Sequence, residues 1–367
     1  MNQQERLYSL DALRGFDMFF IVGGAAFIKA FFGLFPSSFS DFVIKQMYHV
    51  DWHGFTFYDM IFPLFLFIAG VSFPYSLARS YEKGYTNSKI AAVIVKRGMK
   101  LIIFGFVFNG ILTLDFENMR YASVLGRIGI AWMIAALIFV FGDIKWSIGV
   151  SLLILTGYYL VSLFLMNPNA PAGTSPFSIE GSFAAWLDAN YFPGRTFDAA
   201  YEPQGYLSTL PAIVTALLGI LTGNFLKSKR YIAQKKVLLM FVASVVLILT
   251  GLLWNNFFPI NKNLWTSSYV CFAGGLSLLL LTVFYYIIDV LKFRKWSFVF
   301  VVIGMNSITI YMAQKIVDFK HIARFLGSGT VEVFPVNFQP LISSIIYLLI
   351  IWSFLYFLYR KKIFLKV

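Results

Sequence analysis

Long apolar stretches alternate with short polar segments along the whole chain. A helix needs about 20 apolar residues to cross the hydrocarbon core of a membrane, and ten segments have roughly that length and character. The pattern predicts an all-α membrane protein of about ten transmembrane helices, folded as a single multi-pass domain over residues 1–367. The predicted spans are residues 15–35, 55–77, 98–114, 123–142, 146–166, 207–226, 236–255, 266–290, 297–315 and 340–359.

Composition supports the same class of protein. The chain is 59% hydrophobic and 13% charged, whereas soluble domains are about 45–50% apolar and about 25% charged. The first apolar segment is too long for a signal peptide and lacks a small-residue cleavage site, so we expect it to remain as a helix. The single cysteine, Cys271, lies in an apolar run and is expected to serve packing.

The net charge of +13 comes from Lys and Arg in short clusters between the predicted spans. This is typical of cytoplasmic loops that face anionic lipid, and it argues against nucleic-acid binding. Both termini are therefore predicted to be cytoplasmic, which agrees with an even number of spans. The clustered residues are Arg6, Arg14, Arg79, Lys83, Lys89, Lys96, Arg97, Lys100, Lys145, Lys227, Lys229, Arg230, Lys235, Lys236, Lys292, Arg294, Lys295, Arg360, Lys361, Lys362 and Lys366.

A long polar segment, residues 167–206, separates the fifth and sixth spans and is predicted to be extracytoplasmic. It is rich in Pro, Gly, Ser and aromatic residues, and loops of this length are usually functional or disordered. Its aromatic side chains can stack on sugar faces or form an interfacial belt. These residues are Trp186, Tyr191, Phe192, Tyr201 and Tyr206.

Two of the three histidines, His49 and His53, lie in a polar patch at residues 49–59, between the first two spans. Titratable groups at such a position indicate binding or proton transfer. His49 can accept a proton from an attacking nucleophile, and Asp59 can orient its ring or bind the nucleophile. The alternative for His49 is a solvated loop residue. His49, Asp51 and His53 also suit zinc, but no further His or Cys cluster supports a site, so we expect no metal.

The entry to the first span carries a second polar group. Ser9 or Asp11 can cap the helix, and Arg14 shares a helix face with Asp11. The pair is either a capping and snorkelling ion pair or part of a cytoplasmic mouth that receives an anionic ligand. Asp17 lies deeper, where a lone carboxylate costs at least about 2.5–3.5 kcal/mol, so we expect it to meet a basic partner.

Two further polar residues lie inside predicted spans. Arg127, in the fourth span, needs a counter-charge, which a ligand phosphate can supply. Asn306, midway along the ninth span, must find a partner, either in helix packing or in a ligand. The protein groups that can balance Arg127 are Asp115, Glu117 and Asp59.

Taken in order, these pieces resemble the heparan-α-glucosaminide N-acetyltransferase family of transmembrane acyltransferases. The resemblance covers nearly the whole chain. It rests on Arg6, Ser9, Asp11 and Arg14-Gly15; on His49-x-x-Trp52-x-Gly54-x-Thr56-x-x-Asp59-x-x-Phe62-Pro63; and on Gly126-Arg127-Ile128-Gly129, Gly205-x-Leu207-Ser208-Thr209, Asn261-Lys262-Asn263-Leu264-Trp265 and Gly304-Met305-Asn306-Ser307.

The resemblance implies an enzyme of the bacterial plasma (inner) membrane that passes an acetyl group from cytoplasmic acetyl-CoA to an extracytoplasmic amino sugar of the glucosamine type. The family's active-site histidine falls on His49. We expect His49 to act as base or transient acyl carrier, with Asp59 as its partner. The expected acetyl-CoA contacts are Ser9, Asp11, Arg14, Arg97, Lys100 and Arg127. The expected acceptor contacts are Trp52, Thr56, Asn263, Trp265 and Asn306.

The chain departs from the family pattern at two places. Val22 stands where the family often has Asn, so the resemblance does not support an oxyanion-holding or positioning role at that site. Residues 202–205 read Glu-Pro-Gln-Gly where Asp-Pro-Glu-Gly is expected, so the acceptor can differ. Two other functions stay open: a secondary transporter of a sugar or lipid intermediate, and an O-acyltransferase of envelope polysaccharide. Glycine pairs at residues 23–24 and 274–275 suit either a homodimer within the bilayer or packing inside one chain.

Overall fold

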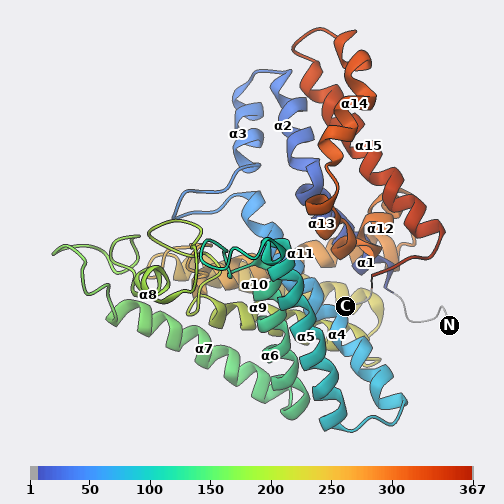
Figure 1. Ribbon diagram of the computed structural model, residues 1–367. Helices are drawn as coiled ribbons and strands as arrows, with labels where there is room; N and C mark the ends of the chain where they lie inside the picture. Colours follow the sequence, from blue (N-terminus) through green and yellow to red (C-terminus); the bar gives the residue numbers. More distant parts are fainter. Residues whose placement is uncertain (1–6, 366–367) are drawn as a thin grey trace. The chain divides into compact units, whose positions relative to one another are not determined.

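The computed structural model describes residues 7–365, so Arg6 and Lys366 of the sequence predictions lie outside the described residues. Helices dominate this part of the chain (Figure 1). Between residues 7 and 365 the only β-structure consists of two isolated bridges, Arg120 with Gly194 and Met166 with Ser182. The predicted all-α class is confirmed.

Eight helices within residues 7–365 are long and apolar enough to cross a membrane, against ten predicted spans. The ninth predicted span is a helix pair bent by 57°, Lys295–Met305 and Ser307–Ile316. The third corresponds to helix α5 (Asn87–Phe108), whose amino-terminal half is charged. The eight are Tyr8–Phe32, Phe57–Glu82, Val124–Phe141, Ile144–Phe164, Thr209–Lys227, Ala233–Trp254, Ser267–Val290 and Gln339–Arg360.

The described chain divides into two compact units. The first unit comprises residues 7–50, 56–61 and 280–365, and the second comprises residues 51–55 and 62–279. The polar patch at residues 49–59 therefore contributes to both, with His49 and Asp59 in the first unit.

In the first unit the backbones of α1 and α12 touch. A Cβ on Gly15 would lie 1.7 Å from the carbonyl oxygen of Phe300, so only glycine fits there. Helix α2 packs on α3, and α14 packs on α15 (Figure 1). The helices are α1 (Tyr8–Phe19), η2 (Phe20–Gly24), α2 (Ala25–Gly33), α3 (Ser38–Gln46), η3 (Phe57–Met60), η5 (Tyr285–Val290), η6 (Lys295–Ser297), α12 (Phe298–Met305), α13 (Ser307–Ile316), α14 (Phe319–Glu332) and α15 (Gln339–Arg360).

In the second unit α5 and α6 form a closely packed pair, because a Cβ on Gly129 would lie 2.8 Å from the carbonyl oxygen of Gly98. Helix α6 also packs on α9, and α8 lies within the long segment at residues 167–206. Its helices are α4 (Ile61–Glu82), α5, η4 (Ile111–Thr113), α6 (Val124–Phe141), α7 (Ile144–Phe164), α8 (Phe183–Tyr191), α9 (Thr209–Lys227), α10 (Ala233–Trp254) and most of α11 (Ser267–Phe284).

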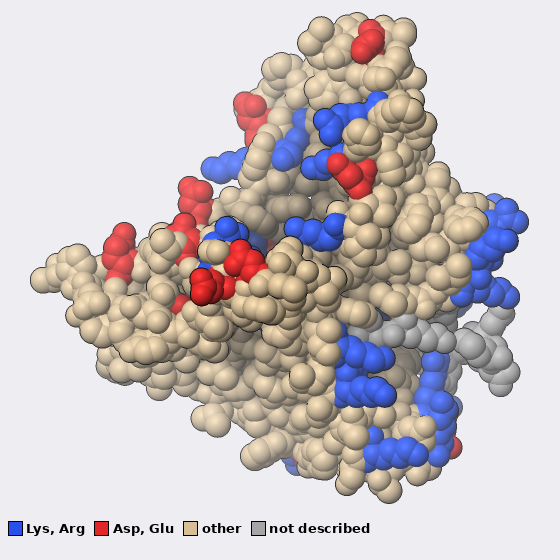
Figure 2. Space-filling view, in the orientation of Figure 1, with Lys and Arg blue, Asp and Glu red and all other residues tan. Residues whose placement is uncertain are grey.

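Apolar residues form much of the surface. Figure 2 shows Lys, Arg, Asp and Glu in separate clusters on one face, with wide uncharged surface between them. Helices α7 and α10 bury little of their length and expose large side chains such as Leu153 and Leu253. Exposed apolar helix faces of this kind suit a lipid environment better than water.

Candidate active site

His49 and Asp59 form a hydrogen-bonded pair in the first unit. His49 follows the end of α3, and Asp59 lies in the 3-10 turn η3 that leads into α4. The distance between His49 Nδ1 and Asp59 Oδ1 is 2.7 Å. The His49 side chain is 50% exposed whereas that of Asp59 is 1% exposed, so the carboxylate holds the ring from the buried side.

The local sequence fixes the position of Asp59. The backbone N–H of Thr56 donates to Asp59 Oδ2 at 3.0 Å, and that of Val50 donates to the same oxygen at 3.4 Å. Thr56 Oγ1 lies 3.0 Å from this oxygen and 2.5 Å from the carbonyl oxygen of Tyr48. This capping arrangement at the start of the turn holds the carboxylate in place beside His49.

This geometry sets the chemistry that the imidazole can perform. When Nδ1 carries a proton and donates it to Asp59, Nε2 presents the lone pair that accepts a proton or attacks a carbonyl carbon. The carboxylate also stabilises the imidazolium that forms when Nε2 takes up a proton. The ring of Tyr58 packs on His49 with centroids 4.7 Å apart and planes tilted by 40°, a contact that the sequence did not predict.

Two other polar side chains of the first unit are deeply buried. Asp17 is fully buried, and among residues 7–365 neither of its carboxylate oxygens has a hydrogen-bond partner, so the expected basic partner is not found. Asp17 acts electrostatically on Tyr58. Asn306 lies at the break between α12 and α13, where its Oδ1 accepts a hydrogen bond from Thr309 Oγ1 at 3.2 Å.

At the start of α1, Asp11 and Arg14 form the predicted ion pair, with 3.5 Å between Asp11 Oδ1 and Arg14 Nη1. The prediction that Ser9 or Asp11 caps this helix is wrong, because the helix begins at Tyr8 and its N-cap residue is Leu7, which makes no side-chain cap. The backbone N–H of Ser9 instead donates to Asp289 Oδ2 at 3.1 Å. Asp289, which lies 280 residues away in sequence, was not a candidate.

The six residues predicted to bind acetyl-CoA are divided between the units: Ser9, Asp11 and Arg14 lie in the first, and Arg97, Lys100 and Arg127 in the second. Arg97 stacks over the Trp132 ring at 4.5 Å, and Lys100 is exposed on the same helix. The predicted cofactor residues therefore do not form one cluster within either unit.

Arg127 is only 2% exposed. Its Nη2 donates to the hydroxyl of Ser208 and, at 3.5 Å, to the carbonyl of Gly205. Its guanidinium lies 5.2 Å from the centroid of the Trp265 ring. A residue predicted to bind the cofactor and one predicted to bind the acceptor thus meet at one place. Within the second unit, the carboxylates that act electrostatically on Arg127 are those of Glu202 and Asp188, which the sequence analysis did not propose as its partners.

The predicted acceptor residues Trp52, Asn263 and Trp265 lie in the second unit. Trp52 Nε1 donates to the carbonyl of Phe177 at 2.8 Å, and its ring lies 5.0 Å from that of Tyr201. Asn263 Nδ2 donates to the carbonyl of Asp51 at 3.2 Å, which joins the polar patch to the entry of α11. Trp265 is 1% exposed, and Thr56 and Asn306 belong to the first unit.

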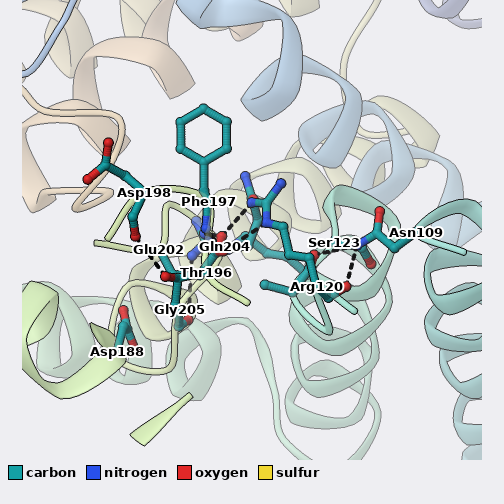
Figure 3. Close-up of polar contacts among 12 residues, drawn as sticks. Asn109, Arg120, Ser123, Asp188, Thr196, Phe197, Asp198, Glu202, Gln204 and Gly205 are labelled. Carbon is teal, nitrogen blue, oxygen red and sulfur yellow. Dashed lines mark hydrogen bonds and ion pairs between the residues drawn. The ribbon is translucent and has the colours of Figure 1, made fainter. Parts of the chain in front are cut away.

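A charged cluster that the sequence did not predict joins Arg120 to the long segment of the second unit (Figure 3). Arg120 Nε donates to Glu202 Oε2 at 2.8 Å and its Nη2 to Oε1 at 2.5 Å, while Nη2 also contacts Gln204. Glu202 is 2% exposed, and its carboxylate also accepts the backbone N–H of Phe197 at 2.9 Å. Because 82 residues separate the two partners in sequence, no short motif indicates their pairing.

Asp188 lies in α8 beside this cluster. Burial raises the pKa of its carboxyl to about 7, against hydrogen bonding from the backbone N–H of Tyr206 and the charge of Arg127, which lower it. A Cβ on Gly205 would lie 1.6 Å from Asp188 Oδ2, so this loop needs glycine at that position. His53 Nδ1 lies 3.4 Å from Asn261 Nδ2, and burial lowers the pKa of this histidine. Among residues 7–365 no three His, Cys, Asp or Glu side chains are grouped as metal ligands.

These features define the class of protein. It is a helical, multi-pass membrane protein with a His–Asp pair at the start of a helix. A family model described as "Heparan-alpha-glucosaminide N-acetyltransferase, catalytic" matches residues 6–252, and the chain belongs to this family. The predicted family is thus confirmed.

Two relatives carry the name heparan-alpha-glucosaminide N-acetyltransferase. The mouse protein is 27% identical over 372 residues, which cover 87% of this chain and 56% of the relative. The human protein is 27% identical over 373 residues, which cover 87% of this chain and 55% of the relative. The chain therefore spans about half the length of these relatives.

Proposed function

We propose that this protein is a transmembrane acetyltransferase that transfers an acetyl group from cytoplasmic acetyl-CoA to a glucosamine-type amino sugar on the extracytoplasmic side of a bacterial plasma membrane. The observation that carries this proposal is the 2.7 Å contact between His49 Nδ1 and the buried carboxylate of Asp59. Membership of the acetyltransferase family supports the reaction class.

In the first route, His49 acts as a general base. Nε2 takes a proton from the acceptor amine as its nitrogen attacks the thioester carbonyl, the C–S bond breaks, and the departing thiolate receives the proton from Nε2. The products are the N-acetyl sugar and coenzyme A. Asp59 stabilises the imidazolium between the two proton transfers.

In the second route, Nε2 of His49 itself attacks the thioester, and coenzyme A leaves before the acceptor arrives. The acceptor amine then attacks the acyl-imidazole and restores the ring. Purified protein incubated with acetyl-CoA alone should then carry an acetyl group on the peptide that contains His49, whereas the first route leaves this peptide unmodified. Mass spectrometry of the quenched protein distinguishes the two.

We also propose binding roles for the polar and charged side chains. Arg14, Arg97 and Lys100 supply cations for the phosphates of acetyl-CoA, since charge-assisted contacts with phosphate are strong. Ser9, Asp11 and Arg127 belong to the same proposed donor group. Trp52, Thr56, Asn263, Trp265 and Asn306 are the proposed acceptor contacts.

The test uses the full chain in proteoliposomes with labelled acetyl-CoA and glucosamine. His49→Ala should lower transfer by about 10²–10⁴-fold, the usual contribution of a general base. His53→Ala is the matched control, because His53 belongs to the same polar patch and its Nδ1 lies beside Asn261 Nδ2, and this variant should retain activity. Wild-type transfer by His49→Ala would rule out both routes.

The same preparation tests the other two functions. Glucose in place of glucosamine should not be acetylated, and acetylation of its hydroxyl groups would favour an O-acyltransferase. Labelled glucosamine that accumulates unchanged inside vesicles without acetyl-CoA would favour a transporter.

A further inference from the structure

A cavity of about 590 Å³ lies in the second unit, among the carboxyl-terminal ends of α4, α6 and α9 and the start of α7. None of the predicted site residues lines it. Its walls are of two kinds: Pro74, Leu77 and Val140 give an apolar surface, and Lys145 and Lys227 give a basic one.

The helices explain why space opens here. A Cβ on Gly70 would lie 2.3 Å from the carbonyl oxygen of Ala216, and one on Gly223 would lie 2.2 Å from that of Val71, so α4 and α9 run in backbone contact up to this level. Pro74 then follows in α4. Proline lacks the N–H that a helix donates four residues back and loosens the backbone around it. The cavity begins at this proline.

The basic wall suits a phosphate group. Among residues 7–365 neither Lys145 nor Lys227 forms an ion pair. The one carboxylate in the lining, that of Asp143, caps α7 by accepting the backbone N–H of Trp146 at 2.6 Å. The amino terminus of α7 adds a partial positive charge, and Asn224 contributes an amide to the same lining.

The surroundings suit the boundary between lipid and water. Ile144 and Trp146, in the first turn of α7, are 48% and 60% exposed, and tryptophan is enriched at this boundary in membrane proteins. Lys229 and Arg230 follow α9 on the same end of the unit. An apolar floor under a basic rim fits an amphiphile with an anionic head, and basic pockets between membrane helices bind such headgroups.

We propose that this cavity binds an anionic phospholipid, with its phosphate held between Lys145 and Lys227 and its glycerol and upper acyl region against Pro74, Leu77 and Val140. This proposal is independent of the acetyltransferase function. Lys145 and Lys227 belong to the basic end of the helices, which faces the leaflet that is rich in anionic lipid. There the negative headgroups attract each lysine.

The test measures binding of phosphatidylglycerol to the purified full chain by native mass spectrometry and by the rise in thermal unfolding temperature, with phosphatidylcholine of the same acyl chains as reference. The double variant Lys145→Gln, Lys227→Gln should bind phosphatidylglycerol about 25-fold more weakly, from about fivefold for each lysine. The matched control Lys229→Gln, Arg230→Gln removes the same charge outside the cavity lining and should change binding less than twofold. Equal losses in both variants, or equal binding of the two lipids by the wild type, would overturn the proposal.

Two further measurements distinguish lipid binding from a folding defect and from binding of a soluble phosphate compound. Ala78→Trp fills the cavity without changing charge and should also abolish the preference for phosphatidylglycerol, so its retention would contradict the proposal even if the lysine variant failed to fold. Pyrophosphate and acetyl-CoA test for a soluble phosphate ligand. Displacement of bound phosphatidylglycerol by either compound, lost in Lys145→Gln, Lys227→Gln, would assign the cavity to that ligand instead of lipid.

Discussion

Replacing Asp59 by asparagine separates its part in the fold from its part in the chemistry. The two carboxylate oxygens have different partners: Oδ2 accepts from the backbone N–H groups of Thr56 and Val50, and Oδ1 faces Nδ1 of His49. Asparagine can keep its carbonyl oxygen toward the two backbone donors. Its amide nitrogen then faces His49 and can only donate.

This exchange reverses the hydrogen bond at His49. Nδ1 becomes the acceptor, and the ring proton moves to Nε2, the atom that must present a lone pair for either catalytic route. We therefore expect Asp59→Asn to reduce the turnover number by about 10²–10⁴-fold. The unfolding free energy should fall by no more than about 1–3 kcal/mol, the worth of one charged hydrogen bond.

The assay is acetyl transfer to glucosamine in proteoliposomes, with thermal unfolding of the same preparation as the measure of folding. Asp51→Asn is the matched control, since this carboxylate is exposed and lies two residues from His49 in the sequence. A wild-type turnover number in folded Asp59→Asn would refute the role assigned to the pair. So would an equal loss in both variants.

Three predictions concern the cluster around the long segment and are read by thermal or chemical unfolding. Gly205→Ala places a methyl group 1.6 Å from Asp188 Oδ2 and should lower the unfolding free energy by about 1–3 kcal/mol. In the control Gly149→Ala the added methyl group meets no atom within 4 Å, so the unfolding free energy should be unchanged or slightly higher. Burial raises the pKa of Asp188 from 3.8 to about 7, so the folded state binds this proton more tightly than the unfolded state. The unfolding free energy should therefore fall as pH rises from about 4 to 7, by up to about 1.4 kcal/mol per pH unit. Asp188→Asn should flatten this pH dependence, and an unchanged slope would contradict the role of Asp188. Arg120→Ala leaves the carboxylate of Glu202 buried without its cation and should lower the unfolding free energy by about 3–5 kcal/mol. Adding Glu202→Gln to this variant should recover part of the loss. Additive losses from the two changes would argue against a stabilising ion pair between Arg120 and Glu202.

The sequence predicted most helices but not all their bounds. Apolar character alone placed the third span at residues 98–114, whereas α5 runs from Asn87 to Phe108. It begins where Thr86 Oγ1 accepts the backbone N–H of Lys89 at 3.4 Å, and it ends before Gly110, whose φ is 97°. Caps and a left-handed glycine therefore set this helix, and its charged first half concealed it from a search for apolar residues.

The candidate site was predictable only where its parts are close in sequence. The contact between His49 and Asp59 joins residues ten positions apart within one motif. The packing of Tyr58 on His49 depends on the 3-10 turn, whose side-chain directions the motif does not specify. The bond between Arg120 and Glu202 depends on how two distant loops meet, and tertiary pairing of this kind leaves no periodic signal in one sequence.

The two oxygens of Asp59 are also the reason why we propose catalysis for the pair rather than helix capping alone. A carboxylate that is 1% exposed is costly unless hydrogen bonds offset its burial, and Oδ2 already receives the backbone donors that begin the turn. Capping thus accounts for one oxygen. The other is directed at a ring that is 50% exposed, where water could satisfy the imidazole without a protein partner. A contact that orients a half-exposed imidazole from its buried side fixes the tautomer of the ring, and in the proposed reaction this tautomer presents Nε2 to a substrate.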